Sequence, residues 1–214
     1  MTRPGTPLAA LALGLVAALG PGSARAEEPW QRVTVRDGVT VERRPVAGSK
    51  IDETRATVST SLSPAQLFAV LWDRRAYKEF VPYIKYEEIL SDSGSEVLVY
   101  DQVHVPLVSD RDYVVRVRSR IDAASQVHRI DFHSDDPAGP PQAPGHIRVR
   151  NIRGGWELRP TTGGGSEVTY WMHSDPGGSI PGWIVNLVQK KEVPKYIRLM
   201  LDRAVQKTGA LTPH

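Results

Sequence analysis

A long alternating segment near the middle of the chain most constrains what the chain can fold into. From Tyr113 to Ile121, apolar residues alternate with polar ones, and three arginines stand on the polar side. This period of two is typical of a β-strand with one face on a core and the other in water. We therefore expect an antiparallel sheet with one solvated face. We interpret the three arginines as part of that face rather than as a nucleic-acid-binding stripe.

Other strand signals surround this segment, with one well-marked helix start among them. Ser63, Pro64 and Gln66 have the pattern of an N-cap, a first helical proline and a capping box. The expected order is a β-hairpin, a strand, a helix, four or five strands and a last helix. This order predicts an α+β fold with an antiparallel sheet. The further strands are expected at residues 33–41, 54–60, 96–105, 127–132, 147–158 and 168–173.

The last helical segment follows a Pro-Gly-Gly turn and contains a proline on its own apolar stripe. Ser179 fits the helix cap, and Pro194 cannot donate a hydrogen bond to the carbonyl of Lys190. A proline inside a straight helix costs about 3 kcal/mol or more. We therefore expect two helical halves that meet at a kink, the second of them (196–205) packed on the sheet.

The N-terminus has the pattern of a secretory signal peptide. Leu8–Leu19 is an apolar run, and residues 24–26 read Ala-Arg-Ala, a cleavage pattern. We expect cleavage near Ala26, a signal peptide at 1–26, one domain at 27–214, and a periplasmic or secreted protein. The alternative is that the run is retained as a membrane anchor. The absence of cysteine excludes a lipoprotein, disulfides and thiolate metal sites.

Charge and candidate catalytic residues favour a non-enzymatic protein. Without the two arginines of the signal peptide, the chain has 25 basic and 24 acidic residues, so we expect no nucleic-acid partner. Asp131 and His133 share one strand face and His128 lies on the other, so the three do not converge on a metal. Asp101 and His104 are expected to be surface residues. We predict no catalytic residue, no metal and no cofactor.

Several motifs together resemble the START (steroidogenic acute regulatory-related lipid transfer) family. They are SDRDYVV at 109–115, GGW at 154–156 and DPGG-x-IP-x-W at 175–183, and the similarity covers nearly all of the chain after residue 26. The resemblance implies a helix-grip fold, in which a curved antiparallel sheet and the C-terminal helix enclose a hydrophobic tunnel. It also implies a non-catalytic lipid carrier that contacts membranes transiently, and we expect a monomer.

The resemblance also implies which positions face the lipid. The aromatic cage for choline matches Tyr113 and Tyr100, but its third position is Ile152. The arginine and aspartate that hold the phosphate fall on Tyr77 and Val81. We therefore expect a rather neutral tunnel that favours a sterol, hopanoid or other weakly polar lipid over a glycerophospholipid.

Further tunnel residues are expected on the central strand and on the helix that gates the tunnel. The arginine of sterol-binding members falls on Val117. The full set of predicted lipid-binding residues is Tyr77, Val81, Tyr100, Tyr113, Val115, Val117, Ile152, Trp183, Ile184, Leu187 and Val188.

The roles of some residues and the class of function stay open at this point. Arg111 and Asp112 are expected to order a turn rather than to touch the ligand, and Trp156 to be a core or rim residue. Trp183 suits either a membrane interface or burial on the sheet.

An exported enzyme on the same scaffold, a cyclase or hydrolase of an apolar substrate, is the alternative to a carrier. It is disfavoured because few titratable residues are expected to point inward. A ligand-sensing module is a third possibility.

Overall fold

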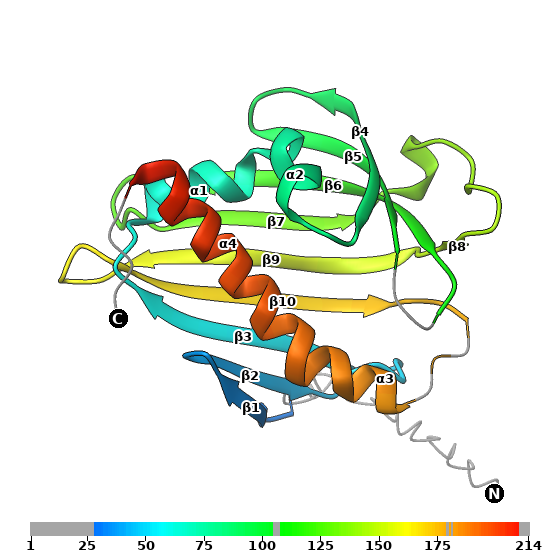
Figure 1. Ribbon diagram of the computed structural model, residues 1–214, viewed down its shortest axis with the longest axis horizontal. Helices are drawn as coiled ribbons and strands as arrows, with labels where there is room; N and C mark the ends of the chain where they lie inside the picture. The colour runs from blue at the N-terminus through cyan, green and yellow to red at the C-terminus, as the bar shows by residue number, and fades with distance from the viewer. Residues whose placement is uncertain (1–27, 105–107, 179, 181, 210–214) are drawn as a thin grey trace, which may run out of the picture.

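One curved sheet lies beneath a long C-terminal helix in the computed structural model (Figure 1), which describes residues 28–104, 108–178, 180 and 182–209. The expected signal peptide and Ser179 lie outside these residues. The strands are β1 (Gln31–Arg36), β2 (Val39–Arg44), β3 (Glu53–Thr60), β4 (Ile84–Asp92), β5 (Glu96–Val103), β6 (Arg111–Ile121), β7 (His128–Ser134), β8 (Ile147–Arg148), β9 (Asn151–Pro160) and β10 (Ser166–Asp175). The helices are α1 (Pro64–Trp72), α2 (Tyr77–Phe80), α3 (Gly182–Leu187) and α4 (Val193–Thr208), with shorter turns η1 (Arg74–Ala76), η2 (Asp136–Ala138) and η3 (Val188–Glu192).

The sheet has the order β1-β2-β3-β10-β9-β7-β6-β5-β4, and every neighbouring pair on this path is antiparallel. The short strand β8 lies off the path and pairs with β6 in parallel. The sheet curves around α4, which crosses its concave face (Figure 1). The expected α+β helix-grip fold is confirmed. The single strand predicted at 147–158 is instead two, because residues 149 and 150 separate β8 from β9.

Local sequence signals fix the start of α1. The Ser63 hydroxyl accepts a hydrogen bond from the Gln66 backbone N–H, and the Gln66 side chain accepts one from the Ser63 N–H. This confirms the predicted capping box, which satisfies two N–H groups that a helix start otherwise leaves unbonded. Leu62 before the cap and Leu67 inside the helix are both buried. The cap therefore sets where α1 begins, and these leucines hold it on the core.

The core lies between the concave face of the sheet and the helices α1 and α4, which pack against each other. Leu67 and Leu71 from α1, and Ile197 and Leu201 from α4, are almost entirely buried. Each such side chain contributes about 1.5–3 kcal/mol when it leaves water. The second half of the last helix is thereby anchored on the sheet and on α1.

The last helix accommodates its proline by a π-helical turn. The segments α3, η3 and α4 are contiguous, and the Val193 N–H donates to the Val188 carbonyl, five residues earlier. Pro194 follows directly in the first turn of α4, where a missing N–H costs little. The last helix therefore divides directly before Pro194, as expected from its sequence, and this π-helical turn joins the two halves. Such π turns are often found at functional positions of helices.

The outer face of the sheet carries a buried ion pair. Asp112 on β6 is fully buried and accepts hydrogen bonds from Arg148 Nε (3.1 Å) and Nη2 (2.8 Å), from the Tyr100 hydroxyl (3.1 Å) and from the Ala143 N–H (2.8 Å). These bonds lower the pKa of Asp112, although burial opposes them. Asp112 therefore ties β6 to the loop before β8, in agreement with the predicted structural role.

Candidate functional site

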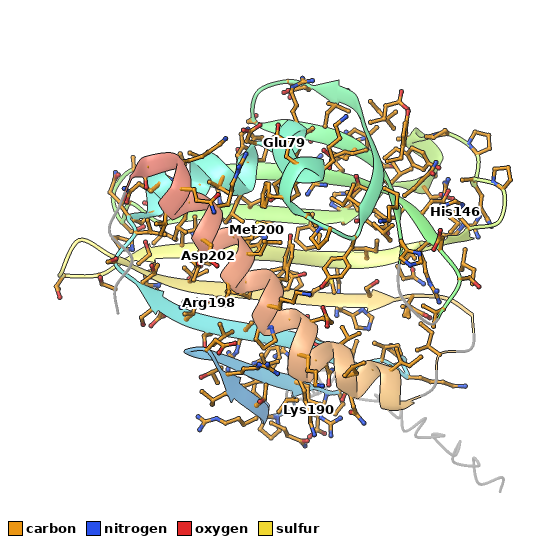
Figure 2. The ribbon with its side chains drawn as sticks, in the orientation of Figure 1. Glu79, His146, Lys190, Arg198, Met200 and Asp202 are labelled. Carbon is orange, nitrogen blue, oxygen red and sulfur yellow. The ribbon has the colours of Figure 1, made fainter. Side chains whose placement is uncertain are left out.

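A cavity of about 420 Å³ lies between the concave face of the sheet and the first half of the last helix. Most of its wall is apolar. It is lined from β6 by Tyr113, Val115 and Val117, from β7 by Ile130 and Phe132, from β9 by Ile152 and Trp156, from β10 by Tyr170 and Met172, and from the last helix by Ile184, Val185, Val188, Gln189 and Tyr196. Its volume is at the lower end of the range of about 300–1,000 Å³ typical of small-molecule sites. Side chains of the sheet and of the last helix fill the space between these two layers (Figure 2).

The structure brings most of the predicted lipid-binding residues together in this wall. They are Tyr77, Tyr113, Val115, Val117, Ile152, Ile184 and Val188. The alternation read in β6 explains the strand residues, since every second side chain faces the concave side. Val81 is buried in the core, and Leu187 is half-buried on α3, but neither is part of the cavity wall. The side chain of Trp183 lies outside the described residues.

Tyr100 differs from its expected position because it faces the outer side of the sheet. It packs with Leu98 and Val114, and its hydroxyl donates to Asp112. The register of β5 and β6 is the physical reason, because Tyr100 pairs with Val114 whereas Asp101 pairs with Tyr113. Neighbouring strand residues point to opposite faces. The second aromatic wall that the resemblance implied is therefore replaced by a carboxylate.

Asp101 is a buried cavity residue, which corrects its interpretation as a surface group. Its Oδ2 accepts a hydrogen bond of 2.9 Å from Arg74 Nη2, and the same nitrogen lies 2.8 Å from Glu87 Oε2. The Asp101 Oδ1 atom and the Arg74 Nε atom are buried without a hydrogen-bond partner among the described residues. Arg74 also stacks over the Tyr77 ring, 3.9 Å from its centre. Arg74 sits in the short turn η1, where no periodic pattern marks it from sequence.

The single guanidinium of Arg74 cannot fully stabilise the negative charges of both Asp101 and Glu87. Burial raises the pKa of Asp101, and burial raises that of Glu87 to about 7 against the opposing pull of Arg74. Burial and the Asp101 charge likewise raise the pKa of the Tyr113 hydroxyl. The cavity wall therefore has a polar region on β5, β6 and η1, formed by Asp101, Tyr113 and Arg74.

The raised pKa of Glu87 predicts how the stability of the protein depends on pH. The folded-state pKa of Glu87 lies above its ordinary value of 4.5. The folded protein therefore keeps a proton that the unfolded chain releases between about pH 4.5 and 7. The free energy of unfolding should fall as the pH rises through this window. Glu87→Gln should remove this contribution, as measured by urea unfolding at pH 5, 6, 7 and 8. Equal pH profiles of the variant and the original protein would contradict the prediction.

Aromatic rings close the cavity beneath α4. The Trp156 ring lies 4.6 Å from that of Tyr170 and 6.0 Å from that of Tyr196, measured between centres. The interpretation of Trp156 as a core or rim residue was incomplete, because it is both buried and part of the cavity wall. Tyr170 and Tyr196 were missed. The alternation of β10 could have indicated Tyr170, whereas the position of Tyr196 depends on how α4 docks.

The lid over the cavity comprises α3 and η3. On η3, Gln189 is buried and donates from Nε2 to the Thr54 hydroxyl (3.2 Å), so this turn is tied to β3. Before α3, Gly177 and Gly178 both adopt positive φ angles, 67° and 66°, and the Asp175 carboxylate accepts from the Gly177 N–H. This confirms the predicted turn at 175–178. Glycine is required there because the left-handed region strains other residues.

The described residues hold neither a candidate metal site nor a candidate membrane span. No group of three or more histidine, aspartate or glutamate side chains there could hold a metal ion. No helix in the same residues has the length and apolar character needed to cross a membrane.

The apolar cavity between the curved sheet and the C-terminal helix defines a helix-grip protein with an internal, ligand-sized cavity. The START domain model matches residues 24–210, and the chain belongs to this family. The chain is similar to "Uncharacterized protein PA1579" of Pseudomonas aeruginosa, with 32% identity over 182 residues that cover 85% of this chain and 86% of that protein. It is 30% identical to the phosphatidylcholine transfer protein of Mus musculus over 177 residues, which cover 80% and 82% of the two chains.

A solved structure supports the same assignment. The crystal structure of a STAR-related lipid transfer protein fragment from Xanthomonas axonopodis superposes with a TM-score of 0.73 at 25% identity. The superposition covers 83% of this chain and 99% of that one.

Proposed function

We propose that this protein encloses one lipid molecule in its cavity and carries it through water from one membrane to another. The observation that carries the proposal is the apolar chamber of about 420 Å³ under the last helix, in a chain of the START family. Each CH₂ group kept out of water contributes about 0.8 kcal/mol, so a lipid with sixteen carbons gains roughly 13 kcal/mol from enclosure. The names of similar proteins, which include phosphatidylcholine transfer proteins, support the same function.

The candidate lipids are a sterol, a hopanoid or a phospholipid. The modest volume of the cavity favours a compact molecule over two long acyl chains. Arg74 is already neutralised by Asp101 and Glu87, so it is not a free cation for a phosphate. The phosphatidylcholine transfer proteins among the relatives favour a phospholipid. Identification of the lipid that co-purifies decides between these classes.

Ligand entry requires that the lid moves. Of the labelled residues on the last helix (Figure 2), Met200 of α4 is buried, whereas Lys190 of η3 is exposed. Val188, which lines the cavity, also has 36% of its surface accessible to solvent. An exposed apolar side chain beside lysines suits a transient contact with a membrane surface. We propose that the lid opens at such a contact, that the protein acts as a monomer, and that it acts after export.

A cavity-filling variant tests the function. Val117→Trp places an indole in the chamber and should lower the rate of lipid transfer between liposomes by at least about tenfold, because the ligand and the new side chain compete for one space. Val35→Trp, at an exposed position of β1, should keep the rate within about twofold. Transfer should be followed with a fluorescent sterol and a fluorescent phospholipid, and the protein purified without detergent should be examined by native mass spectrometry. If no lipid of either class is bound or moved, the carrier function is wrong.

An enzyme acting on an apolar substrate is the second candidate. Its support is the group formed by Arg74, Asp101 and Glu87, because acid–base chemistry needs titratable groups at the ligand. A carrier should return its lipid unchanged. A mass change of the loaded lipid that disappears in Asp101→Asn would favour the enzyme.

A further inference from the structure

One charged side chain of the cavity wall, Arg111, has no ion pair among the described residues. Arg111 is almost fully buried and lines the cavity. Its Nη1 donates to the Ser109 carbonyl, and its Nε donates to the Pro176 carbonyl over 3.4 Å. Its Nη2 has no hydrogen-bond partner in the described part of the chain, and it is not one of the fully buried polar atoms that lack a partner there. In contrast, the other cation in the wall, Arg74, is paired with Asp101.

A buried cation without an anion is energetically unfavourable. Removing a guanidinium from water costs several kcal/mol unless an opposite charge and hydrogen bonds replace its hydration. Two carbonyl groups supply hydrogen bonds but no net charge. The neighbouring Asp110 directs its carboxylate to His104, at 2.7 Å from Nδ1. Burial accordingly lowers the pKa of Arg111, and Asp110 only partly opposes this effect. An anion in the cavity would supply the missing charge.

The position of Arg111 connects this charge to the lid. Arg111 lies two residues before Tyr113 on the same face of β6, so it stands at the polar region of the cavity. Its other neighbour, Pro176, belongs to the glycine turn that leads into α3. A group bound to Arg111 would therefore lie where the enclosed ligand meets the base of the lid.

We propose that Arg111 binds an anionic oxygen group of the enclosed lipid, a phosphate or a carboxylate, at the end of the cavity beside the lid turn. The proposal rests on the proposed lipid-binding function. The forked guanidinium presents Nε and Nη2 to two oxygens of such a group, a geometry that arginine forms readily. The ligand oxygen would replace the long bond to the Pro176 carbonyl, so binding would act on the lid turn. The cavity then prefers an acidic headgroup over a neutral alcohol, against the neutral tunnel expected from sequence.

Three probes with the same sixteen-carbon chain test this preference. Hexadecanol, hexadecanoate and hexadecyl phosphate should each be titrated against a neutral apolar dye, 1-phenylnaphthylamine, bound to the delipidated full-length protein. At least one of the two anions should bind about tenfold or more tightly than hexadecanol, since a hydrogen bond to a charged group is worth about 1.5–3 kcal/mol. The comparison of hexadecanoate with hexadecyl phosphate identifies which acid the site prefers. Equal binding of all three probes by the original protein would overturn the proposal, whatever the variants do.

Two variants separate binding from folding. Arg111→Gln removes the charge but can still donate to the Ser109 carbonyl, and it should reduce the preference for anions to less than about threefold while hexadecanol binds within about twofold of its original affinity. Arg116→Gln, on the same strand but paired outside with Glu96 and Asp135, should keep the preference. An anion preference that persists in a folded Arg111→Gln would overturn the proposal. If none of the probes displaces the dye and no lipid co-purifies, the carrier function itself is wrong.

Discussion

Replacement of Arg74 by methionine is expected to lower the free energy of unfolding by about 3–5 kcal/mol. The guanidinium is the shared partner of two carboxylates, Asp101 and Glu87, and Asp101 has no exposed surface. Removing it leaves negative charge in a low-dielectric environment. The carboxylates can escape this cost only by taking up protons. The loss should therefore be greater at pH 8 than at pH 5, because protonation at low pH removes the unpaired charge.

Urea unfolding of matched variants measures this effect. Arg75→Met is the control, since Arg75 is 68% exposed and lies 3.2 Å from Asp92 at the surface; it should cost less than about 1 kcal/mol. The double variant Arg74→Met, Asp101→Leu should recover part of the loss, because it removes the unpaired buried charge together with its partner. Equal losses in Arg74→Met and Arg75→Met would mean that the buried network does not hold η1 on the sheet.

Replacement of Asp112 by alanine is expected to destabilise the protein by a similar amount, about 3–5 kcal/mol, without changing which ligand it binds. Arg148 is buried and would lose two of its hydrogen bonds, while the Tyr100 hydroxyl and the Ala143 N–H would each lose an acceptor. Asp136 and the Pro140 carbonyl would remain as partners of Arg148. The network lies on the outer side of the sheet, so the cavity wall keeps its side chains.

Thermal unfolding and probe binding together check this second prediction. Asp92→Ala is the matched control, because it removes an exposed carboxylate from a surface ion pair, and surface pairs contribute about 0–1 kcal/mol. At a temperature where Asp112→Ala is folded, its relative affinities for the three sixteen-carbon probes should equal those of the original protein. A changed headgroup preference would show that the outer network controls the shape of the cavity.

The features that were predictable from sequence are those that depend on neighbouring residues. The capping box at Ser63, the glycine turn at 175–178 and the alternation of β6 each rest on a local rule of backbone geometry. That alternation correctly placed Tyr113, Val115 and Val117 on the cavity side. The order of these elements, with the motifs of the START family, was sufficient for the helix-grip fold.

The polar residues of the cavity depend on contacts that no local rule contains. Asp101, and not Tyr100, lies in the cavity wall. The pairing register of β5 and β6 decides which of these two residues points into the cavity. Arg74 reaches Asp101 across 27 residues of sequence, from a turn of only three residues. The sequence by itself determined most of the strands, the start of α1, the family and the apolar face of the cavity. Only the tertiary structure decided where charge enters it, because ion pairing depends on distances between residues that are remote along the chain.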